Sequence, residues 1–448
     1  MTGTLSQIEE ARKGRVKTST EERSRPIGVL IGTTLGFFAG FAGVNVFGPL
    51  VPHFADQFQL SSVAAATLAA IPSLSGALLR IPCGAFAEMF GPRRVILSLL
   101  LTTAVGVAGL LALLALQPAR PLPNAFPLLL LLGIVVGSGI AVFSAAAGQV
   151  SAWSPPDQRG RMLAIFAGLG NTAPAVSALL LPLAASAVGL VGGYALWLAA
   201  LGILTACYAA LAPDAPRHPA GRPWTARATL IAAARRFEVW GLTAGYFVSF
   251  GGYLGLVAWL PSYWHHTYGF SLREAGVLTA VFSLTAAGAR AIGGAATARV
   301  PVRLVVVSTY GVLAAAVVVL ARTTTVSTTV GSLLVVAAAM GVASATVFRI
   351  LAERLPHMVA AASGVVSGLG ALGGFVLPPL MAEIADLNGT EYAPGFLPVA
   401  GLALLVLPAV LLAAGGRRRG HCVEADSSPA SSRHSAARAA RRSACVGS

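Results

Sequence analysis

Two arginines lie inside apolar segments of the chain, 210 residues apart: Arg80 and Arg290. At a helical rise of about 1.5 Å per residue, Arg80 lies roughly 12 Å inside the end of its segment at Glu88, near the middle of a bilayer. A charged side chain at that depth is costly, and it marks a substrate path or pairs with a buried carboxylate. Guanidinium is planar and permanently charged, so two of them facing each other suit a small planar oxyanion. These arginines therefore predict anion binding.

Carboxylates are missing from the middle of every apolar segment. The acids Asp56, Glu88, Glu353 and Glu383 all lie at segment ends. No carboxylate is therefore available to neutralise the two arginines. The sequence also has no metal-ligand cluster, no nucleophile with a base and no phosphate-binding loop, so we expect neither an enzyme nor a cofactor or metal.

The composition is that of an integral membrane protein. The 448 residues are 56% hydrophobic and 10% charged, with a mean hydropathy of +0.77, which predicts a bilayer as the chain's main partner. The net charge of +15 does not indicate nucleic acid, because the basic residues are spread over loops and tails.

Twelve apolar segments are long enough to cross a membrane, which predicts an all-α integral membrane fold of twelve transmembrane helices in two six-helix halves. They are residues 27–51, 63–86, 95–116, 126–149, 162–183, 191–212, 239–263, 274–297, 304–321, 328–352, 358–382 and 395–414. The predicted organisation is a basic cytoplasmic tail (1–26), a first half (27–212), a linker (213–238), a second half (239–414) and a disordered basic tail (415–448). The repeated arginine indicates that the halves are related and that each gives one cation to a central cavity.

Lysine and arginine also predict the orientation. Of the 31 such residues, 26 fall in the tails, the linker and the loops on one side of the segments, and three fall on the other. Because basic residues are retained in the cytoplasm, both termini are expected there, in a multi-pass protein of the cell's inner (plasma) membrane. We expect a monomer.

Glycine motifs mark two further segments and one loop. Small residues at such spacing let membrane helices pack closely, and Asn171 adds amide donors that an anion could use. The fifth segment has Gly168, Gly170 and Asn171, and the eleventh has Gly364, Gly368, Gly370, Gly373 and Gly374. The loop GAFAEMFGPRR has Gly84, Glu88, Gly91, Arg93 and Arg94. Its acid and arginines are expected to lock the cytoplasmic helix ends together in one transport state.

This loop resembles the one between the second and third helices of the major facilitator superfamily. The two deep arginines, GLGN in the fifth segment and YFVSFGGYLGLVAWLP in the seventh together resemble the nitrate/nitrite porter family of that superfamily. The LP of the seventh segment and GALGGFVLPPL of the eleventh look most like its bacterial assimilatory nitrate-uptake branch. The resemblance implies that Arg80 and Arg290 clamp the anion, with Asn171, Tyr246 and Phe143 also in the binding site.

The function implied by the resemblance is secondary active transport of nitrate by alternating access, with proton-linked uptake and with nitrite as a further candidate substrate. The uncompensated arginines favour an alternative cycle, the exchange of nitrate for nitrite, because an empty cavity with two cations is costly to reorient. A carrier of another small oxyanion or a monocarboxylate is a second alternative. A non-transporting anion sensor is a third.

Overall fold

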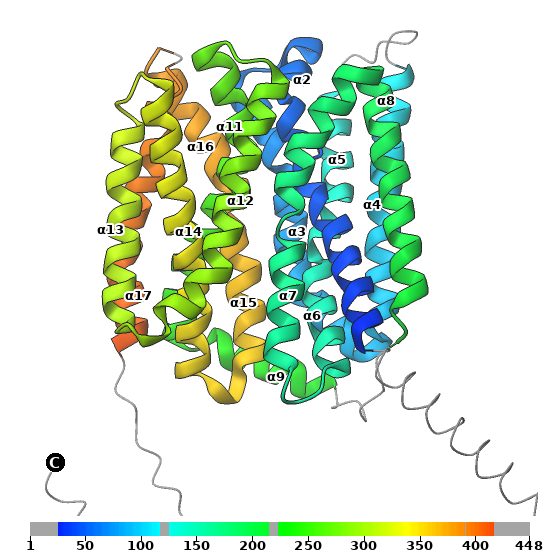
Figure 1. Cartoon of the computed structure of the whole chain (residues 1–448), viewed down its shortest axis with the longest axis vertical. Helices are drawn as coiled ribbons and strands as arrows, with labels where there is room; N and C mark the ends of the chain where they lie inside the picture. The colour runs from blue at the N-terminus through cyan, green and yellow to red at the C-terminus, as the bar shows by residue number, and fades with distance from the viewer. Residues whose placement is uncertain (1–25, 117–124, 215–222, 390, 416–448) are drawn as a thin grey trace, which may run out of the picture. The chain divides into compact units, whose positions relative to one another are not determined.

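The computed structural model describes residues 26–116, 125–214, 223–389 and 391–415. These residues are almost entirely helical and include no strand (Figure 1). The predicted basic tail at 1–26 and the predicted disordered tail at 415–448 lie outside this part of the chain, except for Pro26 and Gly415.

The helices begin with a span over Pro26–Phe58, which contains η1 (Gly43–Asn45), η2 (Gly48–Leu50) and α2 (Val51–Phe58). The first half continues with α3 (Ser62–Phe90), α4 (Pro92–Leu116), α5 (Phe126–Gly137), η3 (Ser138–Ala141), α6 (Val142–Trp153), α7 (Arg159–Gly170) and α8 (Ala173–Leu211). The predicted linker contains α9 (Pro223–Ala234). The second half has α10 (Phe237–Tyr246), η4 (Phe247–Gly251), α11 (Gly252–Tyr268), α12 (Leu272–Ala296), η5 (Thr297–Arg299), α13 (Val302–Leu320), α14 (Val326–Arg354), η6 (Pro356–Met358), α15 (Val359–Ala371), α16 (Gly373–Leu387), η7 (Pro394–Phe396) and α17 (Leu397–Gly415).

Eleven continuous helical stretches of the described residues are long and apolar enough to cross a membrane, and one of them is two spans. That stretch, Arg159–Leu211, has 53 residues, which would be about 80 Å as a straight helix. The chain turns within it at Gly189, where φ is 78° and ψ is 168°. A Cβ on Gly193 would lie 3.0 Å from the backbone nitrogen of Ala185, so the chain folds back on itself there. The predicted twelve-helix fold is thus confirmed.

The spans around the centre of the molecule are interrupted partway along their length. The fourth span passes through η3, and the fifth breaks between Gly170 and Ala173. The seventh passes through η4, a π-helical turn, and the eleventh breaks at Leu372. π-Turns in helices are often found at functional sites, because they re-aim the side chains around them.

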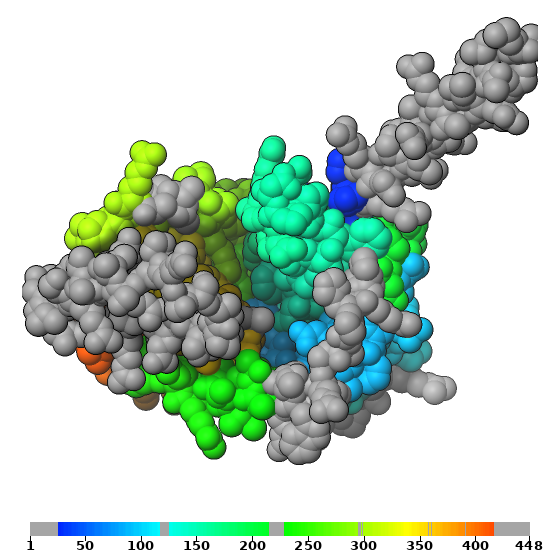
Figure 2. All heavy atoms as spheres, turned by 90° about the horizontal axis from the view of Figure 1, so that it is seen from below, coloured from blue at the N-terminus to red at the C-terminus, as the bar shows by residue number. Residues whose placement is uncertain are grey.

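The two halves contact each other at one end of the spans. There Gly374 packs on Ser73, Gly276 packs on Ala178, and Arg273 Nη2 donates to Ser186 Oγ over 3.0 Å. Farther along α3, Gly368 of the second half packs on Ile81, the residue after Arg80. At the opposite end, seen from below, the surface is hollowed between the teal α7 and the olive helices of the second half (Figure 2). The molecule is therefore closed at the end where α3 begins.

The loop motif lies at the hollowed end. Gly91 ends α3 with φ of 90°, and the N–H of Arg93 donates to Asp214 Oδ1 over 3.2 Å. Arg93 Nη2 donates to Ala209 O at 2.7 Å, which ties α4 to the end of α8. Glu88 is exposed and forms no ion pair with any described residue, so the predicted lock is not engaged in this conformation. Arg94 is also exposed, and Gly84 faces open space.

The glycines of the eleventh span differ in their surroundings. A Cβ on Gly370 would lie 2.8 Å from Tyr246 Cβ, and one on Gly373 would lie 2.3 Å from Phe247 O. A Cβ on Gly364 would have no other atom within 4 Å. In the fifth span, a Cβ on Gly170 would meet Phe37 at 2.0 Å, whereas Gly168 faces open space. Close packing therefore requires glycine at some of these positions and not at Gly168 or Gly364.

We expect Gly373→Ala to lower the free energy of unfolding by about 1 to 3 kcal/mol, because its methyl group overpacks the contact with Phe247. The matched control is Gly364→Ala, which gains about 1 kcal/mol of helix propensity and meets no neighbour. Unfolding of both purified variants in detergent measures the difference. An equal shift in the two variants would contradict the packing difference.

Candidate anion-binding site

Arg80 is buried at the middle of α3, with 2% of its surface exposed. Its Nη1 donates to the carbonyl oxygen of Ser367, on α15 of the other half, over 3.4 Å. Its Nε is buried without a hydrogen-bond partner. A buried N–H without a partner is costly, so this guanidinium has donor capacity left for a ligand.

Arg290 occupies the corresponding place on α12. Its Nη2 donates to the hydroxyl of Tyr246, the last residue of α10, over 3.1 Å. Its Nη1 is buried without a partner. Each half of the chain thus supplies one arginine with an unused N–H group.

One aromatic ring connects the two arginines. Because the ring centroid of Phe250 lies 5.2 Å from Arg80 Cζ and 4.9 Å from Arg290 Cζ, these carbons are at most about 10 Å apart. Phe250 belongs to the π-helical turn η4, which directly follows Tyr246. Its ring stacks on that of Tyr246 at 4.9 Å. The interrupted seventh helix therefore brings both rings to the arginines.

Further aromatic rings surround each cation. Phe143 lies 5.9 Å from Arg80 Cζ and packs on Phe37 and Phe166. Phe348 lies 5.9 Å from Arg290 Cζ, edge-on to Tyr246. The negative faces of such rings partly stabilise a desolvated cation. Because the rings carry no net charge, they do not neutralise the arginines, which can still attract an anion.

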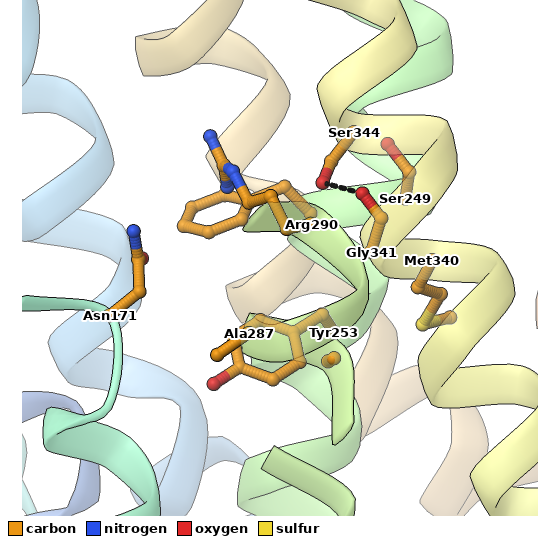
Figure 3. A pocket seen from close by; sticks show the side chains of 10 residues that line it. Asn171, Ser249, Tyr253, Ala287, Arg290, Met340, Gly341 and Ser344 are labelled. Atoms are coloured by element: carbon orange, nitrogen blue, oxygen red, sulfur yellow. Dashed lines mark hydrogen bonds between the residues drawn. The ribbon is translucent and has the colours of Figure 1, made fainter. Parts of the chain in front are cut away.

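Asn171 lies at the break between α7 and α8, with 8% of its surface exposed. Its Nδ2 donates to Ala167 O over 2.6 Å, which leaves one amide hydrogen free. It lines a cavity with Arg290, Phe250, Tyr253 and six further residues. Asn171 stands on one side of this space and Arg290 and Tyr253 on the other (Figure 3).

The cavity is small. Its volume is about 10 Å³, which is room for about one water molecule. Hydroxyl groups on its wall come from Ser249, Ser344 and Tyr253, and Ser344 Oγ donates to Gly341 O at 2.9 Å. A ligand that uses this space can have only a few atoms.

No carboxylate balances the two arginines within the described part of the chain. Every described Asp or Glu lies in a loop or within about a turn of a helix end. The two ion pairs found among these residues, Arg236–Glu238 and Arg349–Glu353, include neither Arg80 nor Arg290. The described residues also hold no cluster of His, Cys, Asp and Glu fit for a metal. The arrangement therefore suits the binding of a small anion.

The structure brings together the five side chains expected in the binding site. In the first half Arg80 lies against Phe143, and in the second half Arg290 donates to Tyr246. Asn171, from the first half, lines a cavity with Arg290. The sequence did not identify Phe250, Phe348 or Tyr253. A signal for Phe250 was present, because it follows Tyr246 by four residues on the same helix. No comparable signal pointed to Phe348, which comes from α14.

Comparisons with known proteins agree with this architecture. The Major Facilitator Superfamily model matches residues 33–378 and 266–444. The chain is 31% identical over 364 residues to the probable nitrate/nitrite transporter NarK2 of Mycobacterium tuberculosis (strain CDC 1551 / Oshkosh), covering 81% of this chain and 90% of that protein. It is 31% identical over 407 residues to the probable nitrate/nitrite antiporter NarK1 of Thermus thermophilus, covering 82% and 88%.

Among solved structures, the human organic anion transporter MFSD10 superimposes with a TM-score of 0.62 at 18% identity, covering 87% of this chain and 99% of that one. This likeness shows the fold. The relatives, the family model and the twelve spans confirm the resemblance to the nitrate/nitrite porter family. The resemblance to its nitrate-uptake branch stays a prediction. The chain is a multi-pass membrane transporter that belongs to the nitrate/nitrite porter family of the Major Facilitator Superfamily.

Proposed function

We propose that the chain carries nitrate, with nitrite as a second substrate, across the membrane, and that the anion binds between Arg80 and Arg290. The observation that carries this proposal is that the guanidinium groups of Arg80 and Arg290 both lie against the ring of Phe250. Each of them also has a buried N–H group without a hydrogen-bond partner. Two relatives named as nitrate/nitrite carriers support the choice of substrate.

The chemistry of guanidinium fits this substrate. Its N–H groups lie in one plane and match the oxygens of a planar oxyanion, so two guanidiniums can hold it from opposite sides. One chain supplies both arginines, which agrees with a monomer. A non-transporting sensor would not require a site shared by two halves that separate at one end.

Alternating access is the transport cycle that we propose. The halves touch at the end of the spans where α3 begins, and a hollow lies between them at the opposite end. Arg80 lies next to the contact between Ile81 and Gly368. Rocking of one half against the other would close the hollow and open the sealed end around the same site. With both termini in the cytoplasm, as the basic residues predict, this conformation faces inward.

For the coupling we propose exchange of anions. An empty site would retain two cations inside the membrane spans, and moving them between conformations without an anion is costly. The name of the Thermus thermophilus relative, an antiporter, agrees with this cycle. Proton-linked uptake is the second candidate, favoured by the resemblance to the uptake branch. It would need water or the substrate as proton carrier, because no carboxylate among the described residues lies near the arginines.

We expect Arg80→Lys to reduce nitrate transport at least about a hundredfold although the charge is kept, because an ammonium group cannot reproduce the planar pair of donors. The measurement is nitrate flux in proteoliposomes. Arg322→Lys, at an exposed position, is the matched control and should transport like the wild type. Normal flux in a correctly inserted Arg80→Lys protein would remove Arg80 from the site.

The coupling is tested with proteoliposomes that contain neither nitrate nor nitrite. Exchange predicts no nitrate accumulation under an inward proton gradient, because the empty carrier cannot return, and rapid uptake once nitrite is loaded inside. Accumulation driven by the gradient alone would show proton-linked uptake and exclude obligatory exchange.

A further inference from the structure

The cavity beside Arg290 matches the size of one oxygen atom. Its volume admits about one water molecule, and an oxyanion oxygen is of similar size. The cavity is lined by Arg290, Phe250 and Tyr253 but not by Arg80. It therefore lies next to Arg290 and away from Arg80. An anion held by both arginines could place one of its atoms there.

Tyr253 brings an unused donor to this cavity. The residue lies in α11, seven positions after Tyr246, with 6% of its surface exposed, and its hydroxyl oxygen is buried without a hydrogen-bond partner. The hydroxyl of Ser283 lies near it, but the two form no well-directed hydrogen bond, and the Ser283 oxygen is also without a partner. A buried phenol normally has a hydrogen-bond partner, so an unpaired one in a cavity wall indicates a ligand atom.

A second unused donor belongs to the same space. Arg290 Nη1 is buried and unpaired. In the close-up view the Tyr253 ring lies below the Arg290 guanidinium, and both face the side where Asn171 stands (Figure 3). An anion oxygen in the cavity would therefore meet two lining residues that each carry an unused donor.

We propose that the cavity receives the third oxygen of a trigonal planar oxyanion, and that the Tyr253 hydroxyl donates a hydrogen bond to it. Tyr253 would then determine specificity between anions of three oxygens, such as nitrate, and anions of two, such as nitrite. This inference rests on the proposed function. In the nitrite complex the cavity would hold a water molecule, which satisfies the same donors.

The test compares the KM values of nitrate and nitrite in proteoliposomes for the wild type and Tyr253→Phe. We expect the KM of nitrate to rise about tenfold, as for a lost hydrogen bond to a charged group, and the KM of nitrite to stay within about twofold. Preserved nitrite transport shows that the variant is folded. An equal change for both anions, or no change for either, would overturn the proposal.

Ser283→Ala is the matched control. If the Tyr253 hydroxyl acts on the anion directly, this variant should keep the wild-type ratio of the two KM values. The same loss of nitrate preference in Ser283→Ala would show that Tyr253 acts only through Ser283 and would overturn the direct contact. A wild-type protein that transports neither anion would instead refute the proposed function itself.

Discussion

The structure depends on two arginines inside the membrane spans, Arg80 buried and Arg290 half-buried, which have no counter-charge among the described residues. Burial of a cation costs several kcal/mol even after the surroundings relax, and here only aromatic faces, the Tyr246 hydroxyl and a backbone carbonyl offset that cost. Such an arrangement is stable only in a body held together by extensive packing elsewhere. In the proposed function, a small anion is the ligand that removes this penalty.

The packing that supports the arginines comes from interrupted helices. Where η4 replaces an α-helical turn, Tyr246 and Phe250 stack beside Arg290, and the glycines Gly370 and Gly373 let the eleventh span approach this turn. Had these helices been continuous and lined by larger side chains, the backbones could not come this close. The breaks therefore connect the glycine pattern of the sequence to the geometry of the site.

Much of this could be predicted from the sequence. Hydropathy predicted the twelve spans, because a bilayer demands long apolar helices. The deep Arg80 and Arg290 indicated the candidate site, because charge is rare at that depth. Phe250 and Phe348 were missed because aromatic residues are common in membrane helices and periodicity does not say which ones face a cation. The turn between the fifth and sixth spans was also predicted, and it lies at Gly189. The unpaired Tyr253 hydroxyl, in contrast, depends on tertiary contacts that no local pattern encodes.

A structure of the protein determined by electron cryomicroscopy with bound nitrate tests the central claim most directly. The account predicts density for one planar anion beside the Phe250 ring, within hydrogen-bond distance of both Arg80 and Arg290. Density elsewhere in the molecule, or an anion that contacts neither guanidinium, would contradict it.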